Sequence, residues 1–203
     1  MKTRIISLIT MVAIVLSTTS LTYASVNNNN NEAVVVATSS NINKIEVSGN
    51  VEVYITNGDK DQVKVYDNYY AQNALVQDKE GVLRISSYTA DKLVVLVTVS
   101  DLRSITVNDN AAVKSYGTFS TVALDVKLNN NASAQLKLNA FAANITVNDR
   151  AKADLSGTVN DYELNYSQSS TVNKTDLTAV NRIEKLTTKY AARPTAADDM
   201  ASL

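Results

Sequence analysis

Residues that could carry acid–base or nucleophilic chemistry are scarce in this sequence. The chain has no His and no Cys, so the usual general base, the commonest metal ligand and the His-assisted or Cys nucleophiles are missing. Its five Gly residues do not have the spacing of a phosphate-binding loop. We therefore expect no catalytic residue, no cofactor and no metal site.

Two acidic residues at equivalent positions are the remaining enzymatic candidates. Asp109 and Asp149 belong to two copies of a repeated pattern, and Asn130 takes the same position in the copy between them. A polysaccharide-cleaving enzyme would use such acids to bind calcium, and a glycosidase would need a close carboxylate pair. The intervening Asn130 separates the two acids, which favours solvated turn residues. A polysaccharide-directed lyase or hydrolase stays as the alternative function.

Tyrosine supplies ten of the twelve aromatic residues. Four of these fall in or beside an irregular stretch, residues 67–92, where an exposed ring could stack on a sugar or on a partner protein. The alternative is that the rings pack one end of the fold. The candidate ligand contacts are Tyr66, Tyr69, Tyr70 and Tyr88.

A strand-like pattern recurs four times between residues 105 and 172. Its copies begin at positions 105, 126, 145 and 164, and are therefore separated by 21, 19 and 19 residues. A repeat of this length without helical periodicity predicts a coiled β solenoid. The copies are Ile105–Val113, Val126–Ala134, Ile145–Ala153 and Leu164–Val172.

Each copy combines inward apolar positions with a polar corner. The first positions should form one buried column, and the small residues Ala111, Ala132, Ala151 and Ser170 should form another where the chain bends sharply. Asn and Asp dominate the corners, because they tolerate left-handed backbone angles and can form an amide ladder between copies. Gly117 and Gly157 predict a second bend at matching positions of the repeat. The corners are residues 108–110, 129–131 and 148–150.

The sequence outside these copies is less regular. Alternation around Asn57-Gly58 predicts a strand–turn–strand unit, and residues 47–53 match residues 107–113 at a spacing of 60, about three repeats. Residues 71–77 suggest a short helix or loop. Near the C-terminus, residues 176–190 place apolar side chains at intervals of three to four, which favours either a capping helix or a last coil.

The N-terminal residues have the order of a secretory signal. Lys2 and Arg4 precede an apolar run over residues 5–16, and Thr22-Tyr-Ala24 offers a cleavage site. The run is shorter than the roughly 20 residues of a spanning helix, so we expect no membrane insertion after signal removal. We expect an exported protein that is periplasmic, secreted or on the cell surface. A net charge of −1 gives no footprint for nucleic acid.

Four stretches carry a further resemblance: Ile45–Gly58, Val63–Val65, Gly81–Ser86 and Val95–Ile105. Their order and spacing resemble those of the head GIN domain proteins, which are described as putative auto-transporter adhesins and are common as exported proteins in Gram-negative bacteria. The resemblance covers residues 42–180, although Asn-rich corners stand where the family usually has Ser-Gly-Ala-Gly. It implies an exported right-handed parallel β-helix without a defined biochemical role.

We therefore predict an all-β fold, a right-handed parallel β-helix (solenoid) with coils of about 19–21 residues, irregular N-terminal coils and a C-terminal capping helix as one option. Residues 1–24 form the signal peptide, 25–41 a flexible Asn-rich leader, 42–180 the β-helix domain and 181–203 the cap and a disordered tail. The predicted function is a non-catalytic envelope or surface module for binding, adhesion or structure. A glycan or an envelope protein is the expected partner, with homo-oligomers through the ends of the solenoid.

Overall fold

The computed structural model describes residues 34–36, 41–66 and 74–187, and within them the chain is all-β with no helix. Fourteen strands in these residues form a single sheet. The predicted signal peptide lies outside the described residues, as do most of the leader and the tail from residue 188. The strands are β1 (Val34–Val36), β2 (Lys44–Gly49), β3 (Val51–Asn57), β4 (Gln62–Tyr66), β5 (Ala74–Lys79), β6 (Val82–Ser87), β7 (Leu93–Val99), β8 (Ser104–Val107), β9 (Ala112–Ser115), β10 (Phe119–Leu128), β11 (Ser133–Val147), β12 (Lys152–Ser167), β13 (Thr171–Asn173) and β14 (Leu177–Thr187).

The repeated residues pair in the register that the sequence predicts. Ile105 lies beside Val126, Val126 beside Ile145 and Ile145 beside Leu164, all in parallel strands. These side chains are at most 2% exposed, and Ala111, Ala132 and Ala151 are fully buried at the bends. The first predicted column and the three alanines of the second are confirmed, and they form the core on the inner face of the sheet, whereas Ser170 is only partly buried.

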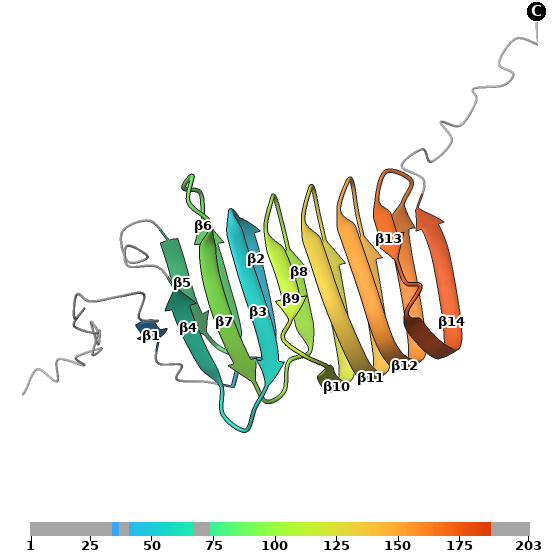
Figure 1. Ribbon diagram of the computed structural model, residues 1–203, viewed down its shortest axis with the longest axis horizontal. Coiled ribbons are helices and arrows are strands. Elements are labelled where there is room, and N and C mark those ends of the chain that lie inside the picture. The colour runs from blue at the N-terminus through green and yellow to red at the C-terminus, as the bar shows by residue number, and fades with distance from the viewer. Residues whose placement is uncertain (1–33, 37–40, 67–73, 188–203) are drawn as a thin grey trace, which may run out of the picture.

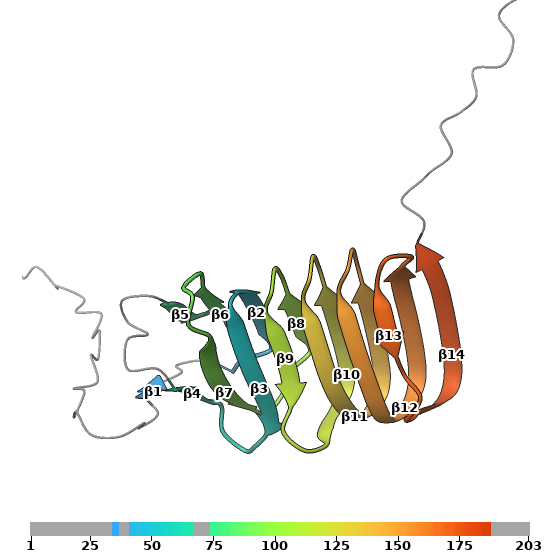
Figure 2. The same cartoon turned by 45° about the horizontal axis from the view of Figure 1, so that its top comes forward.

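The sheet curls into a half-barrel because its long strands bend (Figures 1 and 2). β11, for example, runs down one wall beside β9 and returns up the other beside β10. Pairing is interrupted at the bend, where Val122, Phe141, Asn160 and Val180 occupy equivalent unpaired positions. The two walls face each other across the core, and narrow turns join them along the upper edge in Figure 1.

The prediction of a right-handed parallel β-helix is wrong, because the sheet is mixed and does not follow sequence order. Val47 lies directly beside Val107, and Val53 beside Val113, although the match suggested three repeats between them. The residues between these segments form β4 to β7 on the far side of β2 and β3. Antiparallel pairs join β1 to β4, β4 to β7 and β5 to β6.

Turn chemistry explains the departure from a solenoid. Between β5 and β6, Glu80 and Gly81 both have positive φ, 54° and 79°. Two such residues form the tight turn that suits an antiparallel hairpin. The chain therefore folds straight back instead of advancing by one coil. The helix or loop predicted over residues 71–77 is wrong where the structure describes it, because β5 begins at Ala74.

The C-terminal capping helix is also wrong. Residues 177–187 form β14, which pairs in parallel with β12. A strand satisfies the open backbone groups of β12, which a helix would leave unpaired. The inferred match between Gly117 and Gly157 fails as well, because Leu138 pairs with both Phe119 and Gly157.

Candidate functional site

Three stacked turns along the upper edge of the half-barrel have the same geometry. In each, the backbone N–H of the buried Ala donates to the carbonyl three residues earlier, at 3.1–3.2 Å. The second residue of each turn is left-handed, with φ of 61° at Asp109, 61° at Asn130 and 54° at Asp149. Asn and Asp adopt this region more readily than other side chains. The left-handed backbone at the second position of each turn therefore explains why Asn or Asp occupies it.

An amide ladder joins the first residues of the turns. Asn129 Nδ2 donates to Asn108 Oδ1 at 2.8 Å, and Asn148 Nδ2 donates to Asn129 Oδ1 at 2.9 Å. Ser167 continues the line by donating to the Asp149 carbonyl at 2.8 Å. The predicted ladder is confirmed, and it fixes the turns relative to one another.

The outer residues of these turns form a second set of contacts, which we call the turn row. Asn130 Nδ2 donates to Asp109 Oδ1 at 3.1 Å, and the Asn130 backbone N–H donates to Asp149 Oδ2 at 3.2 Å. Arg150 Nε donates to Asn131 Oδ1 at 3.2 Å. The turn row lines an open hollow of about 690 Å³ and consists of Asp109, Asn110, Asn130, Asn131, Asp149, Arg150 and Ser169.

Tyr88 reaches the turn row from the connection between β6 and β7. Its hydroxyl donates to Asp109 Oδ2 at 3.3 Å, while its side chain stays 75% exposed. Gly49 makes room for this reach, because a Cβ there would lie 3.1 Å from Tyr88 Cδ1 and 2.1 Å from the Ser87 carbonyl oxygen. An exposed aromatic ring therefore stands at one end of a row of polar groups.

The other predicted tyrosines are placed differently. Tyr66 ends β4, opposite Val94, and is 46% exposed. Tyr69 and Tyr70 lie outside the described residues. The structure therefore brings Tyr88 into contact with Asp109 in the turn row, but it does not bring Tyr66 to Asp109. From the sequence, the Asn-rich corners were related only to the bend and to the amide ladder. One left-handed residue is enough for each bend, yet all three positions of each corner are polar.

An ion-pair cluster on the outer wall was missed by the sequence analysis. Glu52 on β3 accepts from Lys114 Nζ at 2.7 Å, from Tyr54 Oη at 2.6 Å and from Lys92 Nζ at 3.3 Å. The hydrogen bond from Lys114, followed by that from Tyr54, lowers the pKa of Glu52 to about 2. The same contacts raise the pKa of Tyr54 and of Lys114. The sequence contains only a weak signal of this cluster, because Lys114 lies 62 residues after Glu52.

This cluster does not suit general acid–base catalysis. A catalytic acid or base works best with a pKa near the operating pH, whereas Glu52 has a pKa far below neutrality. The raised pKa of Tyr54 and of Lys114 keeps both in their protonated forms. The cluster instead links neighbouring strands by ion pairs, because Glu52 on β3 binds Lys114 on β9 and Lys92 just before β7.

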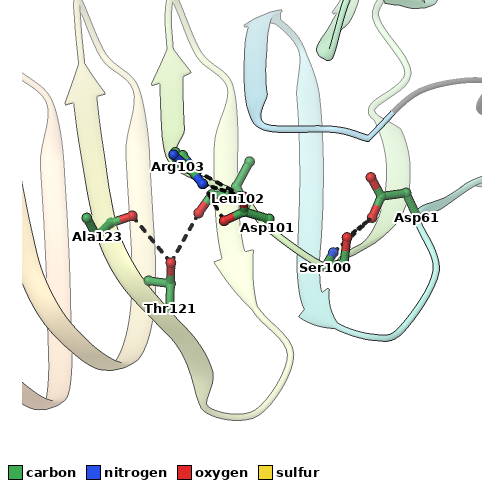
Figure 3. A network of polar contacts seen from close by, with 7 residues as sticks. All are labelled: Asp61, Ser100, Asp101, Leu102, Arg103, Thr121 and Ala123. Atoms are coloured by element: carbon green, nitrogen blue, oxygen red, sulfur yellow. Dashed lines mark hydrogen bonds and ion pairs between the residues drawn. The ribbon is translucent and has the colours of Figure 1, made fainter.

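Polar contacts at the β7–β8 connection fasten the lower part of the fold (Figure 3). Asp61 accepts from the backbone N–H and the hydroxyl of Ser100, at 2.8 and 2.9 Å. Arg103 binds Asp101 at 2.7 Å and lowers the pKa of that carboxyl. Thr121 donates to the Leu102 carbonyl at 3.2 Å. These groups support loops, and the exposed Arg103–Asp101 pair contributes little free energy.

The described residues contain no group of three or more acidic, His or Cys side chains able to hold a metal. Nor does that part of the chain include a helix long and apolar enough to span a membrane. What the upper edge does offer is a rigid line of amide, carboxylate, hydroxyl and guanidinium groups. Such an arrangement can hold a polar ligand by hydrogen bonds.

The fold and this edge define an all-β protein with a repeated polar surface. The family described as "Putative auto-transporter adhesin, head GIN domain" matches residues 41–188. The chain belongs to this family, so the resemblance noted in the sequence is confirmed. No curated relative matches the chain.

Solved structures share the fold at low sequence identity. A putative lipid binding protein from Parabacteroides distasonis matches with a TM-score of 0.56 and 12% identity, over 78% of this chain and 79% of that one. A putative adhesin from Parabacteroides merdae matches with a TM-score of 0.51 and 16% identity, over 77% and 78%. A putative adhesin from Parabacteroides distasonis has a TM-score of 0.51 and 22% identity, over 77% and 79%.

Proposed function

We propose that the chain is an exported, non-catalytic binding module that holds a linear glycan of the cell envelope along the turn row. The observation that carries this proposal is the alignment of stacked polar turns with the exposed ring of Tyr88. The family description as an auto-transporter adhesin supports a surface role. The signal-like order of residues 1–24 supports export.

The chemistry of the turn row fits a hydroxyl-rich ligand. Amide groups both donate and accept hydrogen bonds, carboxylates accept them, and the Arg150 guanidinium donates them. Each hydroxyl of a sugar also donates and accepts. The exposed face of Tyr88 offers an apolar surface on which a sugar ring can stack.

The spacing of the turns favours a polymer over a single sugar. Adjacent turns repeat at the strand separation of ~4.8 Å, so equivalent groups recur along the row. Closed turns and the amide ladder hold these groups in place before binding, and preorganisation of this kind reduces the entropic cost of binding. A linear ligand with its own repeat can use several turns at once.

Enzymatic cleavage of a polysaccharide is the alternative, and the turn row gives it less support. Asp109 and Asp149 are both hydrogen-bonded to Asn130, which lies between them. Neither carboxylate therefore faces the other across a substrate, as paired glycosidase acids do. Glu52, which pairs with both Lys92 and Lys114 on the outer wall, has a pKa of about 2.

Binding of the purified protein to an array of bacterial and host glycans tests the proposal. Tyr88→Ala should weaken binding about tenfold, the value of one lost stacking contact. Tyr116→Ala is the matched control, because Tyr116 is 73% exposed and belongs to the segment after β9. Absence of glycan binding, or an equal loss in both variants, would contradict the proposal.

A second assay separates the binding module from the enzyme. The bound glycan is incubated with the protein, and new reducing ends or unsaturated products are measured. We expect none. Product formation that is abolished in Asp109→Asn would favour the enzymatic alternative.

A further inference from the structure

The C-terminal strand β14 is a sheet edge with an unusual side-chain pattern. In the part of the chain that the structure describes, β14 pairs only with β12, and it lies at one end of the molecule in Figure 1. Apart from Leu177 and Ala179, its side chains are exposed. Three of its apolar residues are half or more exposed: Val180 at 73%, Ile183 at 54% and Leu186 at 50%.

Charged residues occupy the positions of β14 that face the end of the core. Arg182 pairs with buried Tyr162, and Glu184 pairs with buried Leu164. The Arg182 guanidinium lies 5.9 Å from the centre of the Tyr162 ring, and Glu184 forms an ion pair with Lys174. Inward charges on an edge strand oppose pairing with most other strands.

One partner fits this edge by charge. We propose that β14 pairs in an antiparallel manner with β14 of a second copy of this chain, about a two-fold axis at Ile183. Residues directly opposite in an antiparallel pair share a face of the sheet. Ile183 then meets its own copy, and each Arg182 meets the partner's Glu184. Val180 meets the partner's Leu186, so exposed apolar side chains cover one another.

Neighbouring registers fail by the same criterion. An axis at Arg182 would oppose two guanidinium groups, and an axis at Glu184 would oppose two carboxylates. Like charges directly opposite destabilise a strand pair. The charges therefore favour the register with its axis at Ile183. Because a two-fold pair uses the same edge of both copies, it forms a closed dimer and not a fibre.

Single cysteines test this register cleanly, because the chain has no Cys of its own. Ile183→Cys should form a disulfide-linked dimer under mild oxidation, since its thiol would face its own copy within disulfide reach. Asn181→Cys is the matched control on the same strand, and it would face the partner's Lys185. We expect at least tenfold more cross-linked dimer from Ile183→Cys than from Asn181→Cys.

Sedimentation of the uncross-linked protein completes the test. The wild-type protein should associate to a dimer as its concentration rises, and Ile183→Asp should weaken association at least tenfold at neutral pH, where two carboxylates would oppose each other. Val122→Asp, at a 77% exposed position on the bend, should not. A monomer at every concentration, or equal cross-linking of both cysteine variants, would overturn the proposal. So would a dimer that Ile183→Asp leaves intact.

Discussion

The part of the sheet from β8 to β14 and the part from β1 to β7 are organised differently. In the first, which we call the parallel part, every strand pairing is parallel and advances by 19 to 21 residues. In the second, the mixed part, antiparallel pairs join β1 to β4, β4 to β7 and β5 to β6. The comparison shows that a repeated sequence determines register locally, whereas isolated turns determine how unrepeated strands are ordered.

Each part supplies one component of the proposed binding site. The parallel part supplies the turn row, because stacked turns place like groups side by side. The mixed part supplies Tyr88, which lies in a connection that no repeat constrains. The Glu52 cluster joins the two parts, since β3 pairs with β7 on one side and β9 on the other.

The largest expected effect concerns close packing between strands of the parallel part. Gly157 has φ of 101°, and an added Cβ would lie 2.0 Å from the Leu138 carbonyl oxygen. Gly157→Ala should therefore lower the free energy of unfolding by about 3 kcal/mol or more. Gly117→Ala is the control: φ is 81° there, and a Cβ would meet nothing within 4 Å. It should cost only about 1 kcal/mol, from the left-handed backbone. Urea unfolding measures both, and equal losses would mean that β11 and β12 are not packed so closely.

The buried alanine column gives the next largest effect. Ala132 is fully buried at its bend, so Ala132→Leu should cost about 1–3 kcal/mol by overpacking. Ala123→Leu adds the same volume at an exposed position and should change stability by less than about 0.5 kcal/mol. Thermal unfolding compares the two. An unchanged melting temperature for Ala132→Leu would show that the column does not face the core.

An intermediate effect on stability is expected from the Glu52 cluster, which joins the two parts, and it should depend on pH. The pKa of Glu52 falls from 4.5 to about 2 on folding. The contribution of ionised Glu52 to the free energy of unfolding is therefore complete above pH 4.5 and is lost as the pH falls toward 2. Allowing for solvent screening, that loss should be about 1–2 kcal/mol.

Glu52→Gln should be less stable at neutral pH by a similar amount and should lose less on acidification. Asp101→Asn is the control, because its partner Arg103 is exposed and the pair contributes little. Unfolding in urea at a series of pH values measures each protein. Parallel curves for Glu52→Gln and the wild type would contradict the role of the cluster.

The smallest effect isolates the side-chain bonds of the turn row. Asn130→Gly keeps a residue that tolerates φ of 61° but removes the hydrogen bond to Asp109. It should cost about 0.5–1 kcal/mol. Asn130→Ala also introduces backbone strain, and should cost about 1 kcal/mol more than Asn130→Gly. Chemical denaturation of both variants gives the difference, and equal stabilities would place Asn130 outside the left-handed region.

The sequence predicts the parallel part better than the mixed part for a physical reason. Ile105, Val126 and Ile145 recur with the same neighbours, so their pairing can be found by aligning the chain with itself. Val47 and Val107 also match, but nothing local shows that they are adjacent and not three repeats apart. Val47 and Val107 are adjacent because the Glu80-Gly81 hairpin reverses the chain and places β6 on the far side of β2.

The candidate site was predictable only in part. Asn-rich corners and their ladder follow from residue type and spacing, and Tyr88 was among the candidate contacts. Its meeting with Asp109 depends on Gly49 and on the unexpected strand order, which places β2 and β3 beside β8 and β9. The sequence left residues 176–190 open between a capping helix and a last coil, because apolar residues at intervals of three to four also occur on an exposed edge strand. The strand β14 rules out the helix.

Affinity measured against oligosaccharide length shows whether the turn row holds a linear glycan. Calorimetry would use the array's best-binding glycan as fragments of one to six sugars. Turns that repeat at ~4.8 Å predict that affinity rises with each added sugar until the row is covered, and then levels off. Tyr88→Ala should lower every value, and Tyr116→Ala none. A single sugar that binds as tightly as the longer fragments would contradict the claim.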